Sequence, residues 1–371
     1  MRVAFVDTSP FWKYSYGPAH PFRLYRLMLT QKMQEMKRLL EGVKLLTPEP
    51  IDENKLLLFH TRDYLDILKM ANTGEYRDYM AVYGLGYGDN PVFPGVYDYS
   101  RLVAGASSLA AKQVVEGKAE RAFNMAGGLH HAMPDRAYGF CYLNDPVMAI
   151  YELLERYDRI LYLDIDAHHG DGVQLAFYYD DRVLTVSTHE SGRYLFPGTG
   201  YEYEMGEGKG YGYALNVPFP PGAGDDVYTY AFGEVVIPAI RRFNPQVIVS
   251  QLGADALSGD PLTHWNLTLN SYLEVLRFLD SLNLPWVALG GGGYNVANVV
   301  RAWTWVLAVL TRRETDTEVP PEWIPLGEKY GVRLKSLAPE DPTGSSSNVR
   351  VEVEGVVSYL KRRHPLLTGV I

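Results

Sequence analysis

The stretch Asp164-Ile165-Asp166-Ala167-His168-His169-Gly170-Asp171-Gly172 directly follows an apolar run at residues 159–163. A short apolar run of this kind predicts a strand buried on both faces, and such strands belong to parallel sheets, whose carboxyl ends carry the functional groups. Asp166 and His168 are two residues apart, which places both on one side of an extended chain. Because a carboxylate and an imidazole together suit zinc, the stretch predicts a parallel α/β fold with a metal site at the end of one strand.

Other segments repeat this order of buried strand and polar loop. Because helical periodicity separates them, the chain is expected to form a central parallel sheet flanked by helices on both faces. Polar residues at the ends of separate strands then converge on one crevice. The repeated units are residues 121–124 before Gly127-Gly128-Leu129-His130-His131, residues 247–252 before Gly253-Ala254-Asp255, and residues 286–289 before Gly290-Gly291-Gly292-Gly293-Tyr294.

The remaining pattern predicts further elements, all within a single domain of residues 1–371. Asp145 is a candidate helix N-cap, with Pro146 at the first helical position of a helix that runs to about residue 157. A bend is expected at Pro238. Other helices are expected at residues 22–40, 63–70, 99–116, 226–243, 296–310 and 354–362, strands at 183–188 and 214–217, and a long irregular stretch at 72–98.

Composition excludes several classes of function. Acidic residues outnumber basic ones by 44 to 35, which gives a net charge of −9, so no global positive field attracts nucleic acid. The single Cys141 cannot form an internal disulfide, and the amino terminus enters a strand-like run in place of a signal peptide. No apolar stretch reaches the roughly 18–20 residues of a membrane span. A cytoplasmic enzyme without membrane or nucleic-acid partners is therefore expected.

The polar loops contain the groups that a metal-dependent hydrolase needs. Asp166, His168 and Asp255 would supply three zinc ligands and leave a fourth position for water, which is the open arrangement of a catalytic site. Zinc lowers the pKa of its bound water toward about 7 and polarises a carbonyl, so the expected reaction is hydrolysis of an amide or an ester. His130 and His131 would be the bases near that water.

Supporting residues have both a functional and a structural interpretation. Asp164 and Asp171 are available to orient the two histidines, and Tyr294 to donate a hydrogen bond to an oxyanion. Taken singly, each aspartate is more often a cap or turn residue, Tyr294 a packed aromatic, and Arg26 a solvated helix residue. Adjacent histidines on a strand also face opposite ways. The occurrence of four such motifs at predicted loop starts favours an active site.

Together these motifs resemble the signature segments of the zinc-dependent histone deacetylase family, over roughly residues 10–310. The resemblance extends to the bacterial acetoin-utilisation deacetylases and histone-deacetylase-like proteins, which are similar to class I of the eukaryotic family. It implies the arginase-deacetylase fold and a substrate with N-acetyl-lysine side chains. The chain departs from the eukaryotic enzymes, which often have long tails, in having only a short carboxyl-terminal extension at residues 311–371, which is expected to pack on the domain. The segments are residues 127–132, 139–145, 164–172, 196–200, 251–255 and 290–295.

The resemblance also implies a role for individual residues. Zinc, or iron(II) as the alternative, would be bound by Asp166, His168 and Asp255. His131 with Asp171 would be the main general base and then acid, His130 with Asp164 would act electrostatically, and Tyr294 would polarise the acetyl carbonyl. The channel residues would be Asp89 at the rim, then Gly139, Phe140, Phe196 and Leu262, with Arg26 at an internal acetate pocket. A potassium or sodium ion would contact Asp164, Ser187 and the carbonyls of Asp166, His168 and Thr188.

Other activities remain open on the same scaffold. The expected substrate is an acetylated protein, with acetyl-CoA synthetase as the family-based example, and hydroxamates are the expected inhibitors. An acetylpolyamine amidohydrolase is the first rival, although Leu262 stands where such relatives tend to have an acidic residue. A dinuclear manganese ureohydrolase needs more carboxylates than Asp260 alone adds to Asp255. The third rival is an inactive acetyl-lysine-binding protein, against which intact His131 and Tyr294 argue.

Overall fold

A computed structural model describes residues 1–86 and 88–371. Its centre is one sheet in which every neighbouring pair of strands is parallel, in the order β2-β1-β3-β8-β7-β4-β5-β6. This confirms the α/β fold class expected from the sequence. The strands are β1 Val3–Val6, β2 Lys44–Leu46, β3 Arg121–Asn124, β4 Ile160–Asp164, β5 Val183–Glu190, β6 Ala214–Phe219, β7 Val247–Gln251 and β8 Trp286–Leu289.

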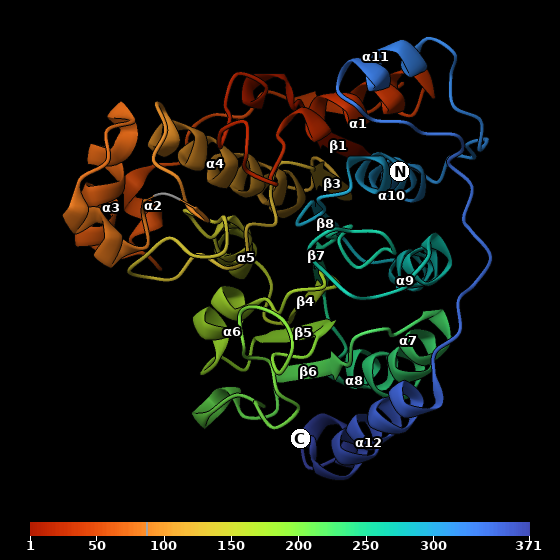
Figure 1. Ribbon diagram of the computed structural model, residues 1–371. Coiled ribbons are helices and arrows are strands. Elements are labelled where there is room, and N and C mark those ends of the chain that lie inside the picture. Colours follow the sequence, from red (N-terminus) through yellow and green to blue (C-terminus); the bar gives the residue numbers. More distant parts are fainter. Residues whose placement is uncertain (87) are drawn as a thin grey trace.

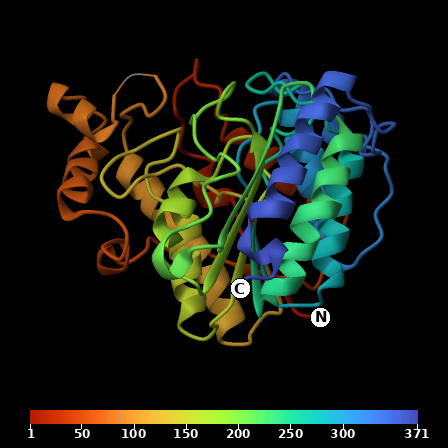
Figure 2. The same ribbon diagram turned by 90° about the horizontal axis from the view of Figure 1, so that it is seen from below.

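Helices cover both faces of the sheet, which is seen nearly edge-on in Figure 2. Helices α4, α5 and α6 pack together on one face, whereas α10, α9 and α7 follow one another on the other (Figure 1). The central strands are buried throughout, as expected for strands covered on both faces. The main helices are α1 Tyr25–Met36, α3 Arg62–Met70, α4 Val96–Val115, α5 Asp145–Leu154, α6 Asp171–Phe177, α7 Asp225–Ala231, α8 Ile237–Phe243, α9 Leu269–Ser281, α10 Val296–Thr311 and α12 Ser347–Arg363; shorter ones are α2 Glu53–Leu56, α11 Trp323–Lys329 and α13 Pro365–Thr368.

The strand order places the predicted polar loops at one edge of the sheet. After β3 the chain forms β4, leaving space for two strands between them. Strands β7 and β8, which come later in the sequence, occupy that space. The loops that follow β3, β8, β7 and β4 therefore emerge from four adjacent strands. Since these strands are parallel, all four loops lie at their common carboxyl ends, where ligands bind in open α/β sheets.

Several expected elements differ from the structure in their limits. The helix expected at residues 22–40 is shorter, α1, and the chain turns at Arg38, which has a φ of 58°. Asp145 is not the N-cap of α5. The neighbouring Asn144 accepts the capping hydrogen bond from the Val147 N–H, and Asp145 is the first helical residue. The irregular stretch 72–98 contains a 3-10 helix at Asp78–Tyr83 and the start of α4, while residue 87 lies outside the described residues.

The helix expected at residues 226–243 is divided by a π-helical turn, Phe232–Val236, which separates α7 from α8. Pro238 is one of the first two residues of α8, so the π-helical turn comes just before it. Because proline has no N–H to donate, a regular α-helix cannot continue through this position. Helices α6 and α9 were not expected from the sequence. None of the helices in the described ranges is long and apolar enough to cross a lipid bilayer.

Residues after α10 pack back onto the sheet domain. Helix α12 contacts the edge strand β6 and helix α7 (Figure 1). The Asp225 carboxylate accepts hydrogen bonds from the Thr343 N–H at 2.9 Å and from the Thr268 N–H at 3.0 Å, which ties the extension to the start of α9. The expected late helix at residues 354–362 is thus the second half of a longer one.

Helix α4 approaches the segment before α2 so closely that it requires glycine at position 105. A β-carbon on Gly105 would collide with the Glu49 carbonyl oxygen and lie 2.8 Å from the Ile51 nitrogen. We expect Gly105→Ala to lower the free energy of unfolding by about 1–3 kcal/mol, because overpacking outweighs the roughly 1 kcal/mol that alanine gains in helix propensity.

Gly355 is the matched control, since it is exposed in α12 and nothing lies near its added β-carbon. Gly355→Ala should leave stability unchanged or raise it by up to about 1 kcal/mol. Thermal and urea unfolding measure both variants. Equal stability changes in the two variants would contradict the close approach of α4.

Candidate active site

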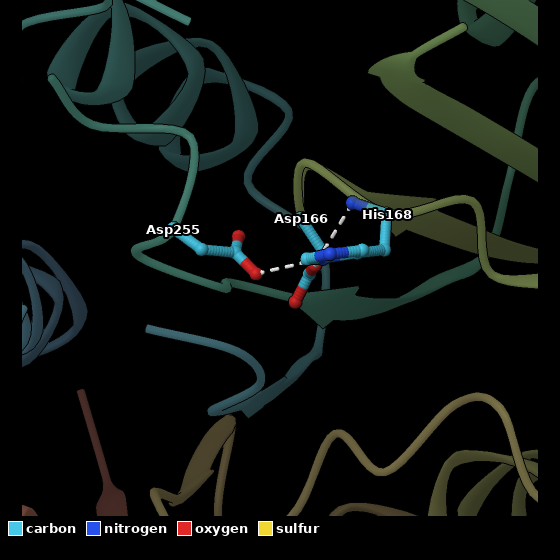
Figure 3. A group of neighbouring side chains, drawn as sticks. All are labelled: Asp166, His168 and Asp255. Atoms are coloured by element: carbon cyan, nitrogen blue, oxygen red, sulfur yellow. Dashed lines mark hydrogen bonds and ion pairs between the residues drawn. The ribbon is translucent and has the colours of Figure 1, made fainter. Parts of the chain in front are cut away.

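Three predicted metal ligands meet at the carboxyl ends of β4 and β7. Asp166 and His168 lie in the loop after β4, and Asp255 lies in the loop after β7; their side chains point toward one another (Figure 3). The His168 Nδ1 atom is 3.1 Å from Asp166 Oδ1 and 3.0 Å from Asp255 Oδ2. One ligand atom of each residue lies within 4.8 Å of the other two, and all three residues are buried.

The chemistry of this donor set fits a divalent cation. Two carboxylates at most 1% exposed lie side by side, and within the described residues His168 is their only cationic ion-pair partner. Burying such charges without a compensating cation is costly. Burial lowers the pKa of His168, but the hydrogen bonds and charges of Asp166 and Asp255 raise it to about 10. A metal ion therefore has to displace a proton from this group in order to bind.

Hydrogen bonds orient both carboxylates. Asp166 Oδ2 accepts from the Gly292 N–H at 2.7 Å and from the Gln251 Nε2 amide at 2.8 Å, and Asp255 Oδ1 accepts from the Ala167 N–H at 2.9 Å. A side chain on Gly292 would collide with Asp255, so this glycine allows the backbone to lie against the ligands. Each carboxylate keeps its other oxygen directed at His168.

The two predicted bases lie together beside this group. His130 and His131 follow β3 in a turn at Gly128, which has a φ of 90°, and not on a strand. The expectation that adjacent histidines face opposite ways does not apply here, because the turn rotates the two side chains toward each other. Their Nε2 atoms are 3.0 Å apart.

Each histidine has its own carboxylate partner, as the sequence suggested. His130 Nδ1 lies 2.7 Å from Asp164 Oδ2, which also accepts from the Tyr162 hydroxyl at 2.7 Å. His131 Nδ1 lies 2.7 Å from Asp171 Oδ1. Asp164 ends β4 and Asp171 begins α6, so the residues that orient the histidines flank the loop that holds two of the metal ligands.

The pKa values of the two histidines are shifted in opposite directions. Burial lowers the pKa of His130, but the Asp164 carboxylate, followed by Asp166, raises it to about 9. The pKa of His131 falls well below its ordinary value because of burial and then the positive charges of His130 and His168. The raised pKa of His130 favours its charged form, whereas the lowered pKa of His131 favours the neutral form that can act as a base.

A cavity of about 220 Å³ leads from the surface to this group. His131, His168 and Tyr294 lie among its lining residues. Within the described residues, no group hydrogen-bonds the Tyr294 hydroxyl, and burial raises the pKa of this phenol well above its ordinary value, so that it stays a donor. The other lining residues are Asp89, Gly139, Phe140, Leu195, Phe196 and Leu262. Every channel residue expected from the resemblance is among them, and Leu195 is an addition.

Comparison with known proteins agrees with this geometry. The family model described as the histone deacetylase domain matches residues 20–310. The chain is 42% identical over 320 residues to histone deacetylase B of Dictyostelium discoideum, which covers 86% of this chain and 76% of that protein. It is 39% identical over 358 residues to histone deacetylase 1 of Homo sapiens, and this match covers 95% of this chain and 73% of the human protein. The chain belongs to the histone deacetylase family. Members of this family are hydrolases that remove acetyl groups from lysine.

Arg26 is not the solvated residue that a lone helical arginine usually is. The Arg26 side chain is only 1% exposed, and its guanidinium donates hydrogen bonds to the carbonyls of Gly291 at 2.7 Å and Gly293 at 2.9 Å. It supports the glycine run before Tyr294. A small cavity of about 10 Å³ behind His131 does not include Arg26 among its lining residues, and the acetate pocket stays a prediction.

The residues predicted to bind a monovalent ion lie at the end of β4, in the loop after it, and in the second half of β5. Asp164 and Ser187 are paired in the register of these two strands. The Ser187 hydroxyl bonds His189 Nδ1 at 2.8 Å, and the Thr188 hydroxyl lies 2.9 Å from that of Tyr228. Of these two hydroxyls only that of Ser187 is an expected ligand, since Thr188 would contribute its carbonyl, and the ion itself remains a prediction.

Asn144 and Asp145 hold the histidine loop from two sides, a role that the sequence did not predict. The Asp145 carboxylate accepts from the N–H groups of Gly128 at 2.9 Å and Leu129 at 2.8 Å. The Asn144 amide donates to the carbonyls of His130 and Ala132, both at 3.0 Å. The signal was present in the sequence, because these two adjacent polar residues interrupt an apolar segment.

His169, the remaining histidine after β4, points away from the metal ligands. Its Nδ1 lies 2.9 Å from the Thr199 hydroxyl and its Nε2 lies 3.1 Å from the Gln174 amide oxygen. Its ring packs on His189, which bonds the Gly200 carbonyl at 2.7 Å. His169 therefore secures the loop that carries Phe196 of the channel wall.

We predict that Asp166→Ala abolishes metal binding, because it removes one of three converging ligands. Zinc and iron per chain, measured by elemental analysis after dialysis, should fall from about one in the unmodified protein to nearly none. Asp89→Ala is the matched control, since this exposed carboxylate lies in the same cavity without contacting the ligands. Normal metal content in Asp166→Ala would overturn the assignment.

Proposed function

We propose that the protein is a zinc-dependent deacetylase that hydrolyses the acetamide of N-ε-acetyl-lysine in proteins and releases acetate. The observation that carries this proposal is the narrow cavity that joins an exposed rim at Asp89 to His131, His168 and Tyr294. Its walls at Phe140, Phe196 and Leu262 are apolar, which suits the four-carbon stem of a lysine whose charge is removed by acetylation.

The channel is open because position 139 is glycine. A β-carbon on Gly139 would lie 2.8 Å from the Phe196 ring and 2.6 Å from the His131 ring. The Phe140 ring packs edge-on against Tyr294 at 5.7 Å, and the Phe196 ring packs edge-on against His131 at 5.0 Å. The two aromatic walls thus contact the two groups that would act on the acetamide.

Asp166, His168 and Asp255 would hold zinc, which supplies Lewis acidity toward the acetyl carbonyl and toward water. His131 accepts the proton of the attacking water at Nε2, because Asp171 holds its Nδ1–H, and returns the proton to the lysine nitrogen as the C–N bond breaks. The charged His130, fixed by Asp164, stabilises the negative charge that develops. The Tyr294 hydroxyl donates to the acetyl oxygen as that oxygen becomes negative.

The finer assignments rest on resemblance. Acetylated metabolic enzymes, with acetyl-CoA synthetase as the example, are proposed substrates, and hydroxamates, which chelate metals, are proposed inhibitors. A monovalent cation, potassium or sodium, is proposed beside Asp164 and Ser187, and iron(II) as the alternative catalytic metal.

An assay across substrates tests the proposed reaction. We expect faster turnover of acetyl-lysine peptides than of N-acetylspermidine, because the apolar Leu262 offers no partner to a second ammonium group, and we expect inhibition by a hydroxamate. Release of acetate is measured for both substrates at equal concentration. A strong preference for the polyamine would reject the lysine substrate and favour the acetylpolyamine amidohydrolase.

Tyr294→Phe tests the role of the phenol. We expect kcat to fall by about 10²–10³-fold while zinc content stays normal, because the hydroxyl stabilises the transition state and does not contact the metal ligands. Tyr138→Phe is the matched control: its ring packs on Phe196 at 4.7 Å but does not line the cavity. Loss of zinc in Tyr294→Phe, or an equal fall of kcat in Tyr138→Phe, would refute the role.

A further inference from the structure

Asp260 joins two loops of the active site through its carboxylate. Its side chain is buried, at 7% exposure. One oxygen, Oδ2, accepts from the N–H groups of Tyr294 at 2.7 Å and Asn295 at 3.1 Å. The other, Oδ1, accepts from the Leu262 N–H at 3.0 Å. Both oxygens are thus directed at backbone donors and not at a metal ion, and no described lysine or arginine forms an ion pair with this carboxylate.

The segment before Tyr294 has little support of its own. Residues 290–293 are all glycine, and Gly291 and Gly293 have φ values of 145° and 132°, which side chains rarely tolerate. No side chain in this run can pack to fix the direction in which the chain reaches Tyr294. The position of the phenol therefore depends on hydrogen bonds from outside the run, and Asp260 supplies the one to its own N–H.

The second loop carries the channel wall. Leu262 lines the cavity two residues after Asp260, and the Thr263 hydroxyl donates to the Asp255 carbonyl at 2.7 Å. The start of α10 is joined to the same loop, because the Asn298 amide donates to the Ser258 carbonyl at 3.0 Å. The Leu262 wall and Tyr294 are thus joined through one carboxylate, that of Asp260.

We propose that Asp260 is a positioning residue for Tyr294, which it holds over the cavity and couples to the Leu262 wall. This inference rests on the proposed function. A carboxylate is required because three N–H groups converge on it, and an asparagine would present an NH₂ group to at least one of them. The effect reaches the reaction through the Tyr294 hydroxyl.

A double-mutant cycle tests this coupling. We expect Asp260→Asn to lower kcat by roughly tenfold or more while zinc content stays normal, with Tyr294→Phe setting the upper limit. In the Tyr294→Phe background, Asp260→Asn should then change kcat by less than about twofold, since the hydroxyl it positions is gone. The same fold-loss in both backgrounds would overturn the proposal, as would an unchanged kcat in the single variant.

Asp225→Asn is the matched control for loss of a buried carboxylate. Asp225 also accepts several donors from separate loops, among them the N–H groups of Thr268 and Thr343, but it does not line the cavity. We expect a lower Tm with unchanged kcat. If Asp225→Asn lowers kcat as much as Asp260→Asn does, the effect is one of general stability and the proposal fails.

A milder variant serves if Asp260→Asn does not fold. Asn298→Ala removes the hydrogen bond that the Asn298 amide donates to the Ser258 carbonyl. A fall of kcat of at least about twofold that disappears in the Tyr294→Phe background supports the proposal. No fall, or the same fall in both backgrounds, overturns it. Failure of the proposed function is a separate result, because the unmodified protein would then prefer N-acetylspermidine to the acetyl-lysine peptide. In that case the double-mutant cycle is measured with N-acetylspermidine as the substrate.

Discussion

The structure depends on two carboxylates, Asp166 and Asp255, that the parallel strands β4 and β7 bring together in the interior. Both are buried, and their mutual repulsion is relieved by His168 between them and by the N–H donors of Gly292 and Ala167. Burying two carboxylates is costly without compensating charge and donors, and at this site His168 and the surrounding backbone supply both. The glycines beside it are the visible consequence, because a side chain on Gly292 would occupy the space of the carboxylates.

Around this centre, the groups that would act on a substrate are all held through contacts with other loops. His130 and His131 are oriented by Asp164 and Asp171, and their own backbone is held by Asn144 and Asp145. Tyr294 follows a run without side chains and is held through its N–H by Asp260. Each of these side chains is thus supported by a polar partner from elsewhere in the fold, which gives the rigidity that catalysis by orientation requires.

Much of this could be predicted from the sequence because the signals were local. The buried strands before each polar loop, the helices at α3 and α10, and the identity of the metal and base candidates all lie within short segments of regular pattern. In two places a contact with a distant segment decided what the neighbouring residues could not. Arg26 is buried because carbonyls of Gly291 and Gly293 accept its hydrogen bonds, and Asp145 is occupied by the loop at Gly128 and Leu129, so that capping passes to Asn144.

The sequence by itself determined the class of fold and the chemistry of the site, because alternation of buried strands with helices and the choice of Asp, His and Tyr at strand ends are properties of neighbouring residues. The tertiary structure alone decided which partners meet. The chain passes from β3 to β4 and only later inserts β7 and β8 between them, so four loops separated by up to about 170 residues converge at one edge of the sheet. That convergence lowered the pKa of His131, placed Asp260 beside Tyr294 and placed His169 against the Phe196 loop, and none of these is encoded in the spacing of adjacent residues.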